Sequence, residues 1–393
     1  MRHLYLAATG QNRGKTTASL GLIDGFRRRG FHTGFMKPVG QRTVIEDGLP
    51  ADEDAVLMRA IFGLPEPYSV MSPVHIPRGF TKAYIAGDVV EDLGAKVVAA
   101  HREFAHHDVL LIEGTGHAGV GAVVGLSNAA VAAMLGAPAV IISEGGVGRP
   151  IDEIVLNAAL FAAHGVPVAG ALVNKVRVDE QPGIERTLER GLARHGIPLL
   201  GILPYWPILS NPTLGMILEG VGGRLIHPGP DLDRVIEGVA VGAMEPHHMI
   251  EHIGPGTLVI VPGDREDAIL TLVAAHVADD AREAARLHSR EHLDALVDGT
   301  PGAVDVGPGN RALGIVLTGG YEPRPEVIQA IRNAGMFAAA VREDTYTVAS
   351  EIHDLLVKTH AADAGKIGLI KDLVWEHLRI DRFLDAAAVA KTA

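Results

Sequence analysis

A stretch near the amino terminus, Leu4–Leu20, has the residue types of a phosphate-binding loop. Leu4–Ala8 is a short apolar run typical of a buried strand, Gly10–Gly14 is predicted to turn, and Thr16 is predicted to open a helix. Backbone N–H groups at a helix N-terminus carry partial positive charge, so such a turn can wrap a polyphosphate while Lys15 adds a full charge. The Thr16 hydroxyl is then available to Mg²⁺.

The spacing of this loop departs from the usual pattern of phosphate loops. That pattern has a glycine five positions before Gly14, where this chain has Thr9, and its first glycine is Gly10. An ordinary glycine-containing loop before a helix is the alternative interpretation. We favour the phosphate loop because strand, turn, Gly-Lys-Thr and helix occur together in the order that the motif requires.

Three further polar side chains, Lys37, Glu113 and Asn174, come at the ends of predicted strands. Open α/β sheets bind ligands at the carboxyl ends of their strands, although Lys37 alone is equally typical of a surface lysine. Burying a carboxylate at a strand end without a cation is costly, so Glu113 is predicted to bind Mg²⁺. Asn174 has the donors and acceptors to contact an adenine edge.

Three carboxylates, Asp52, Glu53 and Asp54, open the predicted helix over residues 51–62. Acidic residues in a first turn complement the helix dipole, so a capping role accounts for all three. One of them, turned toward the phosphate loop, would instead hold Mg²⁺ directly or through water. The residues alone do not choose between these interpretations.

The elements that must position these side chains alternate between strand and helix over residues 1–209. This alternation predicts an α/β fold with a doubly wound parallel sheet, which would collect Lys15, Lys37 and Glu113 at one edge. Prolines and polar residues at 209–214 predict a linker. Beyond it, residues 210–393 are predicted to form a smaller α/β domain with C-terminal helices.

The composition excludes several classes of function. The chain has 393 residues, no cysteine and a formal net charge of −12. It can therefore form no disulfide or thiolate site, and its acidic charge argues against nucleic acid as a default partner, because binding of nucleic acid needs a basic face. No signal peptide is evident, and Asn128–Ile142 is split by Gly136 and Pro138 into segments too short to span a bilayer. We expect a cytoplasmic protein that acts on a small molecule and forms a homo-oligomer.

The motifs resemble a known family. Thr9–Thr17, Lys37-Pro38-Val39, Asp54, Glu113-Gly114 and Asn174 are similar to the corresponding parts of dethiobiotin synthetase and its relatives among the cobyrinic-acid-synthase-like P-loop proteins. The whole chain resembles more closely the amino-terminal half of the long type of phosphotransacetylase, where such a domain precedes a DRTGG domain. The residues that name this domain occur here as Asp264, Arg265, Thr318, Gly319 and Gly320.

The resemblance implies roles for the matching positions. In dethiobiotin synthetase, the positions matching Thr16, Asp54 and Glu113 hold Mg²⁺, the one matching Lys37 steadies a carbamate that is phosphorylated, and the one matching Asn174 reads adenine. Lys15 and Lys37 would be the catalytic residues, because lysines offset charge that develops on the transferred phosphoryl group. The ATP phosphates would be held by Gly10, Gln11, Asn12, Arg13, Gly14, Lys15, Thr16 and Thr17.

Two departures from the relatives narrow the function. The acetyl-transfer domain of the long phosphotransacetylases follows the DRTGG region, where this sequence stops, so we expect no acetyl transfer from it. Ser72–Thr81 has no clear match to the diaminopelargonate-binding loop of dethiobiotin synthetase, which speaks against biotin synthesis. We expect a protein that uses ATP and Mg²⁺ to hydrolyse ATP or to phosphorylate a small carboxylate-type metabolite, with the DRTGG domain serving assembly or sensing. The alternative is a non-catalytic, nucleotide-sensing regulator of a metabolic enzyme.

Overall fold

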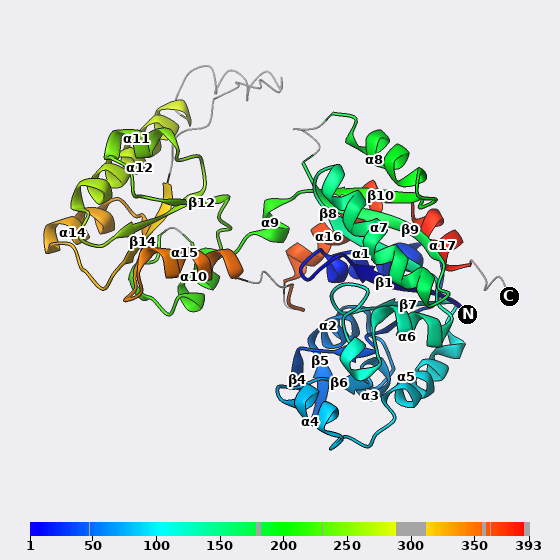
Figure 1. Ribbon diagram of the computed structural model, residues 1–393. Coiled ribbons are helices and arrows are strands. Elements are labelled where there is room, and N and C mark those ends of the chain that lie inside the picture. Colours follow the sequence, from blue (N-terminus) through cyan, green and yellow to red (C-terminus); the bar gives the residue numbers. More distant parts are fainter. Residues whose placement is uncertain are drawn as a thin grey trace. The chain divides into compact units, whose positions relative to one another are not determined.

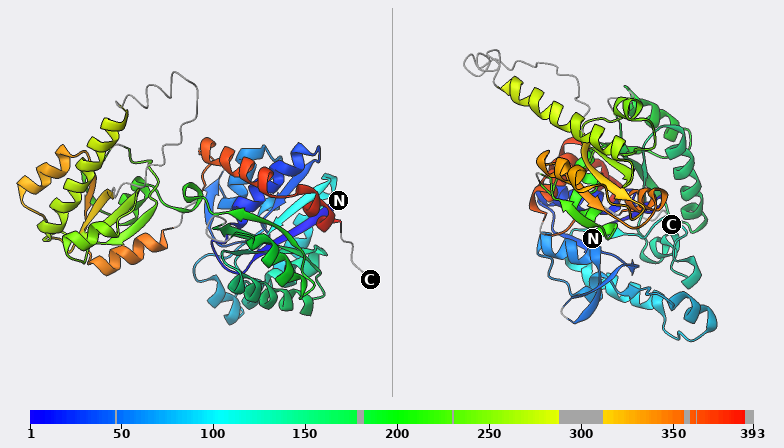
Figure 2. Two further views of the ribbon diagram at one scale, coloured as in Figure 1. Left: turned by 90° about the horizontal axis from the view of Figure 1, so that it is seen from above. Right: turned by 90° about the vertical axis from the view of Figure 1, so that its left-hand side faces the viewer.

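The computed structural model describes residues 1–46, 48–177, 182–229, 231–287, 312–355, 359–361 and 363–388. The chain divides into two compact units (Figures 1 and 2). Met1–Trp206 and Thr359–Ala393 form the first unit, and Pro207–Lys358 forms the second.

A six-stranded parallel sheet is the centre of the first unit. Its apolar strands are buried and helices lie on both of its sides, as Figure 2 shows, which confirms the predicted doubly wound α/β fold. All carboxyl ends of the strands reach the same edge. In spatial order the strands are β10 (Leu199–Pro204), β9 (Val168–Val176), β8 (Ala139–Glu144), β1 (Arg2–Ala8), β7 (Val109–Glu113) and β2 (Thr33–Met36).

Between β2 and β7 the chain forms short elements that bring the acidic first turn of helix α2 (Glu53–Phe62) to the sheet edge. Two small two-stranded sheets, one parallel and one antiparallel, lead into and out of this helix. The strands are β3 (Val39–Gly40), β4 (Thr43–Glu46), β5 (Leu49–Asp52) and β6 (Val74–His75). The helices of the unit before the linker are α1 (Lys15–Arg28), α2 (Glu53–Phe62), α3 (Tyr68–Met71), α4 (Phe80–Ala86), α5 (Leu93–Arg102), η1 (Glu103–His106), η2 (Ala122–Val124), α6 (Asn128–Leu135), α7 (Gly148–Ala163) and α8 (Ile184–Ala193).

The C-terminal helices belong to the first unit, which corrects the predicted second domain of residues 210–393. Helices α16 (Ala364–His377) and α17 (Ile380–Ala387) both pack against α1. Helix α16 also contacts β10, and α17 contacts β1 and β9. The chain therefore returns to the first sheet after it has formed the second unit.

Two glycines of α1 explain why the returning helices settle there. A Cβ on Gly21 would lie 2.3 Å from Val374, and one on Gly25 would lie 2.6 Å from Ile380, so only glycine lets these apolar side chains sit against the α1 backbone. Trp375 lies under the guanidinium group of Arg28, 5.1 Å from Cζ to the ring centroid. Sequence periodicity does not reveal such a long-range contact.

The second unit is a smaller α/β domain built on a five-stranded sheet. Its strands pair in parallel, except that β11 runs antiparallel to β15. Apolar clusters fill both faces of the sheet. In spatial order the strands are β11 (Arg224–His227), β15 (Phe337–Ala340), β14 (Ala312–Thr318), β13 (Thr257–Pro262) and β12 (Gly238–Val241). The helices are α9 (Pro207–Ser210), α10 (Leu214–Gly220), α11 (Pro246–Glu251), α12 (Glu266–Leu287), α14 (Pro325–Asn333) and α15 (Thr345–Asp354).

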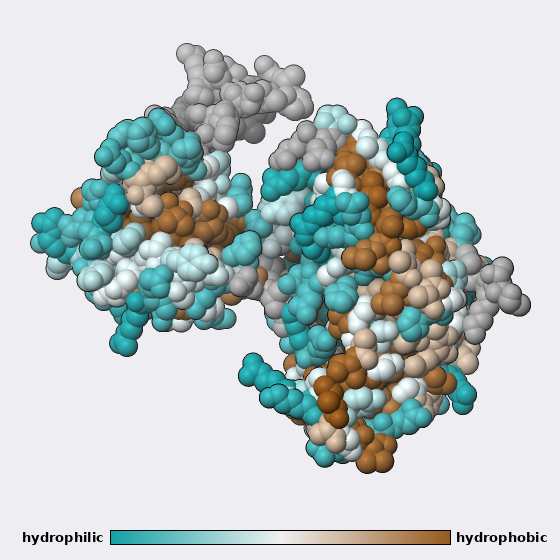
Figure 3. Space-filling model, in the orientation of Figure 1, coloured by the Kyte–Doolittle hydropathy of each residue, from teal (hydrophilic) through white to brown (hydrophobic). Residues whose placement is uncertain are grey.

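Apolar residues reach the surface of both units in patches between polar ones (Figure 3). The exposed apolar side chains of the first unit include Ile45, Ile85 and Val90. None of the helices in the described part of the chain is long and apolar enough to cross a lipid bilayer.

Candidate functional site

The predicted phosphate loop connects the end of β1 to the start of α1. Helix α1 begins at Lys15, and Gly14 before it is left-handed, with φ of 90°. A Cβ on Gly14 would lie 2.0 Å from the Asn174 side-chain nitrogen, so this position requires glycine both for its backbone angle and for space. Gln11 and Asn12 of the loop are exposed to solvent.

Lys15 stands in the loop as a buried cation. Its side chain is almost fully buried, and among the described residues its amine donates one hydrogen bond, to the Gly10 carbonyl at 3.5 Å. Burial, together with repulsion from Lys37, lowers the pKa of Lys15 to about 8. A buried cation with so few acceptors is well prepared to bind an anion, because the anion supplies the missing partner.

The predicted metal ligands meet in one cluster at the sheet edge. The Thr16 hydroxyl donates to Asp54 at 2.9 Å and lies 3.4 Å from Glu113. The Lys37 amine bridges the same two carboxylates, 2.5 Å from Asp54 and 2.7 Å from Glu113. The Ser19 hydroxyl donates to the second Glu113 oxygen at 2.6 Å. Residues far apart in sequence therefore lie side by side, because their strands end at the same edge.

The charges of this cluster hold one another in place. Burial would lower the pKa of Lys37, but the two carboxylates outweigh it and raise that pKa well above its usual value. Burial likewise acts to raise the pKa of Asp54, yet the Lys37 charge and hydrogen bonds from Lys37 and Thr16 bring it down to about 2. For Glu113, which is fully buried, burial prevails and raises the pKa. The positive charge of Lys37 thus offsets the energetic cost of burying the two carboxylates.

The structure separates the roles of the acidic residues that open α2. Asp52 is the N-cap, and its side chain accepts a hydrogen bond from the Asp54 backbone N–H at 3.0 Å. Asp54 turns inward to Lys37 and Thr16. Capping therefore belongs to Asp52, while the position of Asp54 is compatible with a metal ligand.

Asn174, at the end of β9, lies against the phosphate loop rather than in the carboxylate cluster. Its side-chain N–H donates to the Arg13 carbonyl at 3.1 Å. Lys175 has a left-handed backbone, with φ of 55°, and donates to the Asn12 carbonyl at 3.1 Å. This strand end thus supports the loop backbone, and the predicted contact of Asn174 with adenine stays a prediction.

Two acidic residues beside the loop were missed by the sequence reasoning. Glu144, the last residue of β8, forms ion pairs with Arg13 and with Lys175, the latter at 3.2 Å. Glu153 of α7 accepts a hydrogen bond from Thr9 at 2.8 Å. The signal for Glu144 was present, because it is a carboxylate at the end of an apolar strand, like Glu113. Nothing in the spacing points to Glu153, which lies within a helix.

Replacing Gly14 by alanine is expected to disrupt the loop. The added Cβ meets Asn174, and the left-handed backbone is strained for alanine, so Gly14→Ala should lose about 1–3 kcal/mol of unfolding free energy in chemical denaturation. Gly30→Ala is the matched control, since Gly30 has a similar φ of 84° but nothing within 4 Å of its Cβ position. Equal losses in the two variants would contradict the close contact with Asn174.

Comparisons with known proteins agree with this architecture. The phosphate acetyltransferase of Pseudomonas putida is 25% identical over 393 residues, covering 96% of this chain and 51% of the relative. That of Nitrosomonas europaea is 22% identical, with the same coverage of 96% and 51%. The chain spans about half the length of these curated relatives. The resemblance to phosphotransacetylase is thereby confirmed, whereas the relation to dethiobiotin synthetase stays a prediction.

Solved structures and protein families were matched to the chain as well. The CBS and DRTGG domains of Clostridium perfringens pyrophosphatase, in complex with diadenosine tetraphosphate, match 38% of this chain and 50% of that one, with 19% identity and a TM-score of 0.27. MinD of Pyrococcus horikoshii, in complex with Mg-ADP, matches 53% of this chain and 83% of that one, with 16% identity and a TM-score of 0.34. Residues 2–213 match the P-loop family described as AAA domain (AAA_26), and residues 216–355 match the DRTGG domain. Since the first match spans more than half of the sequence, the chain belongs to the AAA domain (AAA_26) family and carries a DRTGG domain after it.

Proposed function

We propose that the first unit binds ATP with Mg²⁺ and transfers the γ-phosphoryl group to water or to a small carboxylate-type metabolite beside Lys37. One observation carries this proposal: the Thr16 hydroxyl lies within 3.4 Å of both Asp54 and Glu113, one residue after the buried Lys15. These are oxygen donors of the kind that Mg²⁺ selects, gathered beside a phosphate-type loop. The DRTGG domain then serves assembly or ligand sensing.

The residues of the cluster fit a bound metal ion and nucleotide. Thr16, Asp54 and Glu113 would hold Mg²⁺, and the ion would neutralise charge on the β- and γ-phosphates. Lys15, whose buried amine has few acceptors, would bind the phosphates directly. Lys37 already places a positive charge between the two carboxylates, so a cation is tolerated at that position.

Phosphoryl transfer needs little further chemistry from the protein. An oxygen of the acceptor forms a bond to the γ-phosphorus, the bond to the β-phosphate oxygen breaks, and ADP leaves. The Lys37 amine would leave one carboxylate to orient the acceptor and offset its charge, while Lys15 stabilises the charge on the transferred group. The same arrangement without an acceptor directs the transfer to water.

The proposal is tested by measuring ADP release from Mg-ATP with a panel of small carboxylates. We expect ADP release that requires Mg²⁺ and is lost in Lys15→Met. Tight ATP binding without ADP release under any condition would contradict the enzymatic function and favour a nucleotide-sensing regulator. Absence of ATP binding would contradict both functions.

The affinity for ATP is expected to fall as pH rises above 8. Lys15 has a pKa of about 8, so it binds phosphate as a cation below that pH and loses its charge above it. With about one tenth of Lys15 charged at pH 9, the Kd measured by calorimetry should rise about 10-fold between pH 7 and pH 9. A Kd that stays constant over this interval would contradict the proposed contact between the charged Lys15 and the phosphates.

A further inference from the structure

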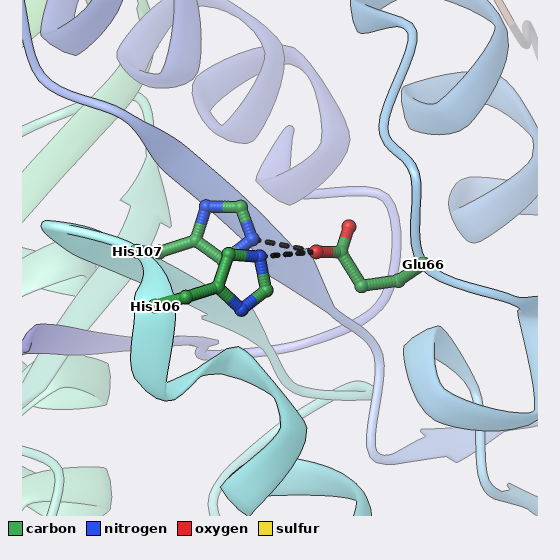
Figure 4. Close-up of side chains that lie close together, drawn as sticks. All are labelled: Glu66, His106 and His107. Carbon is green, nitrogen blue, oxygen red and sulfur yellow. Dashed lines mark hydrogen bonds and ion pairs between the residues drawn. The ribbon is translucent and has the colours of Figure 1, made fainter.

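A second cluster of metal-binding side chains lies at the opposite end of β7 from Glu113. We propose that Glu66, His106 and His107 form a binding site for a divalent transition-metal ion of the zinc class. The Glu66 Oε1 atom lies 2.6 Å from Nε2 of His107 and 3.2 Å from Nε2 of His106. Figure 4 shows that both imidazole rings turn this nitrogen toward the carboxylate. One ligand atom from each of the three residues lies within 4.8 Å of the others.

The distances suit a small ion after a slight expansion. Zinc bonds of 2.0–2.1 Å place tetrahedral ligand atoms about 3.3 Å apart. The separation of Glu66 from His106 already has this value, while the hydrogen bond to His107 must lengthen by about 0.7 Å to admit the ion. Two imidazoles and one carboxylate are a donor set that zinc uses, and the exposed His106 side leaves room for water at a fourth position.

The local backbone holds the three ligands in place before any ion binds. Glu66 stands between Pro65 and Pro67, and each proline restricts the backbone around it. His106 is the last residue of η1, and His107 follows it directly. The short 3-10 helix therefore presents two neighbouring imidazoles to one carboxylate.

Two neighbours fix the plane of the His107 ring. The ring of His32 stacks on it, with 4.3 Å between the centroids and 18° between the planes. Gly34 of β2 packs close to the edge of the ring that carries Nε2, because a Cβ on Gly34 would lie only 3.2 Å from that atom. The ring is therefore oriented by packing rather than by the hydrogen bond to Glu66 alone.

A hydrogen bond between Glu66 and His107 does not by itself satisfy these groups. Both side chains are buried, and within the described part of the chain neither the second Glu66 oxygen nor Nδ1 of His107 has a hydrogen-bond partner. Arg27 contributes positive charge nearby, but it donates its hydrogen bonds to Thr33 and to the Phe62 carbonyl.

A metal ion here would connect the two elements that carry the carboxylates of the nucleotide site. Glu66 follows the end of α2, whose first turn holds Asp54, and His107 precedes β7, whose last residue is Glu113. The ion would therefore hold α2 and β7 at a fixed distance from each other, and it would do so at the ends that lie away from Asp54 and Glu113. This inference does not depend on the proposed function of the first unit.

The test measures Zn²⁺ binding to the full chain after treatment with a chelator. Because the chain has 19 histidines, weak surface binding must be separated from the proposed site. The variants are Glu66→Gln and His106→Ala, the latter at an exposed position that leaves the core intact. His247→Ala is the matched control, since His247 is also exposed and also packs against an adjacent histidine, with 3.9 Å between the ring centroids.

We expect one tight equivalent of Zn²⁺ in competition with a chromophoric chelator. Glu66→Gln and His106→Ala should each weaken its affinity at least about 10-fold and reduce the rise in Tm that Zn²⁺ produces, whereas His247→Ala should leave both unchanged. Co²⁺ in place of Zn²⁺ should give the visible absorption of a tetrahedral site in the wild type and not in His106→Ala. The proposal is overturned if the tightest zinc site survives both cluster variants, if it is lost in His247→Ala, or if no equivalent binds.

Discussion

Lys15→Met is expected to weaken ATP binding strongly and, at the same time, to make the ligand-free protein more stable. The folded-state pKa of Lys15 is about 8, below the usual 10.5, because the charged amine is buried and faces Lys37. A lowered lysine pKa means that the charge costs stability below pH 8, and that this cost disappears as pH rises toward 10.5. At about 1.4 kcal/mol per pKa unit, the difference between 10.5 and about 8 makes the gain from methionine on the order of 3 kcal/mol at pH 7.

The same substitution removes the charge that the phosphates would bind. Loss of a charged hydrogen-bond partner is expected to weaken ATP binding about 100-fold or more. Urea denaturation without ligand gives the change in stability, and calorimetry with Mg-ATP gives the change in affinity. Lys96→Met is the matched control, because Lys96 is exposed and should leave both quantities nearly unchanged. If Lys15→Met unfolds at a lower urea concentration than the wild type, the burial of the Lys15 charge does not cost stability and this explanation is wrong.

The grouping of polar residues at one sheet edge could be predicted, because the carboxyl ends of parallel strands all lie at that edge. Once Lys37 and Glu113 are recognised as residues that follow apolar strands, the topology requires them to be neighbours, and the structure places them 2.7 Å apart. The pattern did not say which acidic residue of α2 turns inward. That depends on the N-cap geometry of Asp52, which directs Asp54 toward Lys37.

The parts that escaped prediction depend on contacts between distant segments. Helices α16 and α17 join the first unit through Gly21 and Gly25, which read as ordinary helix residues in the sequence. The cluster of Glu66 with His106 and His107 has no metal-binding spacing, because its carboxylate and its imidazoles lie 40 residues apart. Only the packing of the segment after α2 against the start of β7 brings them together.

Lys37→Met is expected to cost about 3–5 kcal/mol of unfolding free energy at neutral pH. The variant leaves Asp54 and the fully buried Glu113 facing each other without the amine that bridges them. Glu113 already has a raised pKa, and loss of Lys37 raises it further, so protonation relieves the repulsion. When the pKa of a carboxyl group is raised in the folded state, the unfolding free energy of the protein falls as pH rises. The difference in unfolding free energy between Lys37→Met and the wild type, measured by urea denaturation, should therefore be smaller at pH 4 than at pH 8.

Two further measurements separate this electrostatic cause from lost packing. Lys37→Met combined with Glu113→Gln removes the buried charge as well as its partner, so part of the lost stability should return at pH 8. Mg²⁺ should also stabilise Lys37→Met more than the wild type, because the ion supplies the cation that the two carboxylates lack. A deficit that is the same at pH 4 and pH 8 and is insensitive to Glu113→Gln would show that Lys37 acts by filling space, and its charge would then have no part in organising the site.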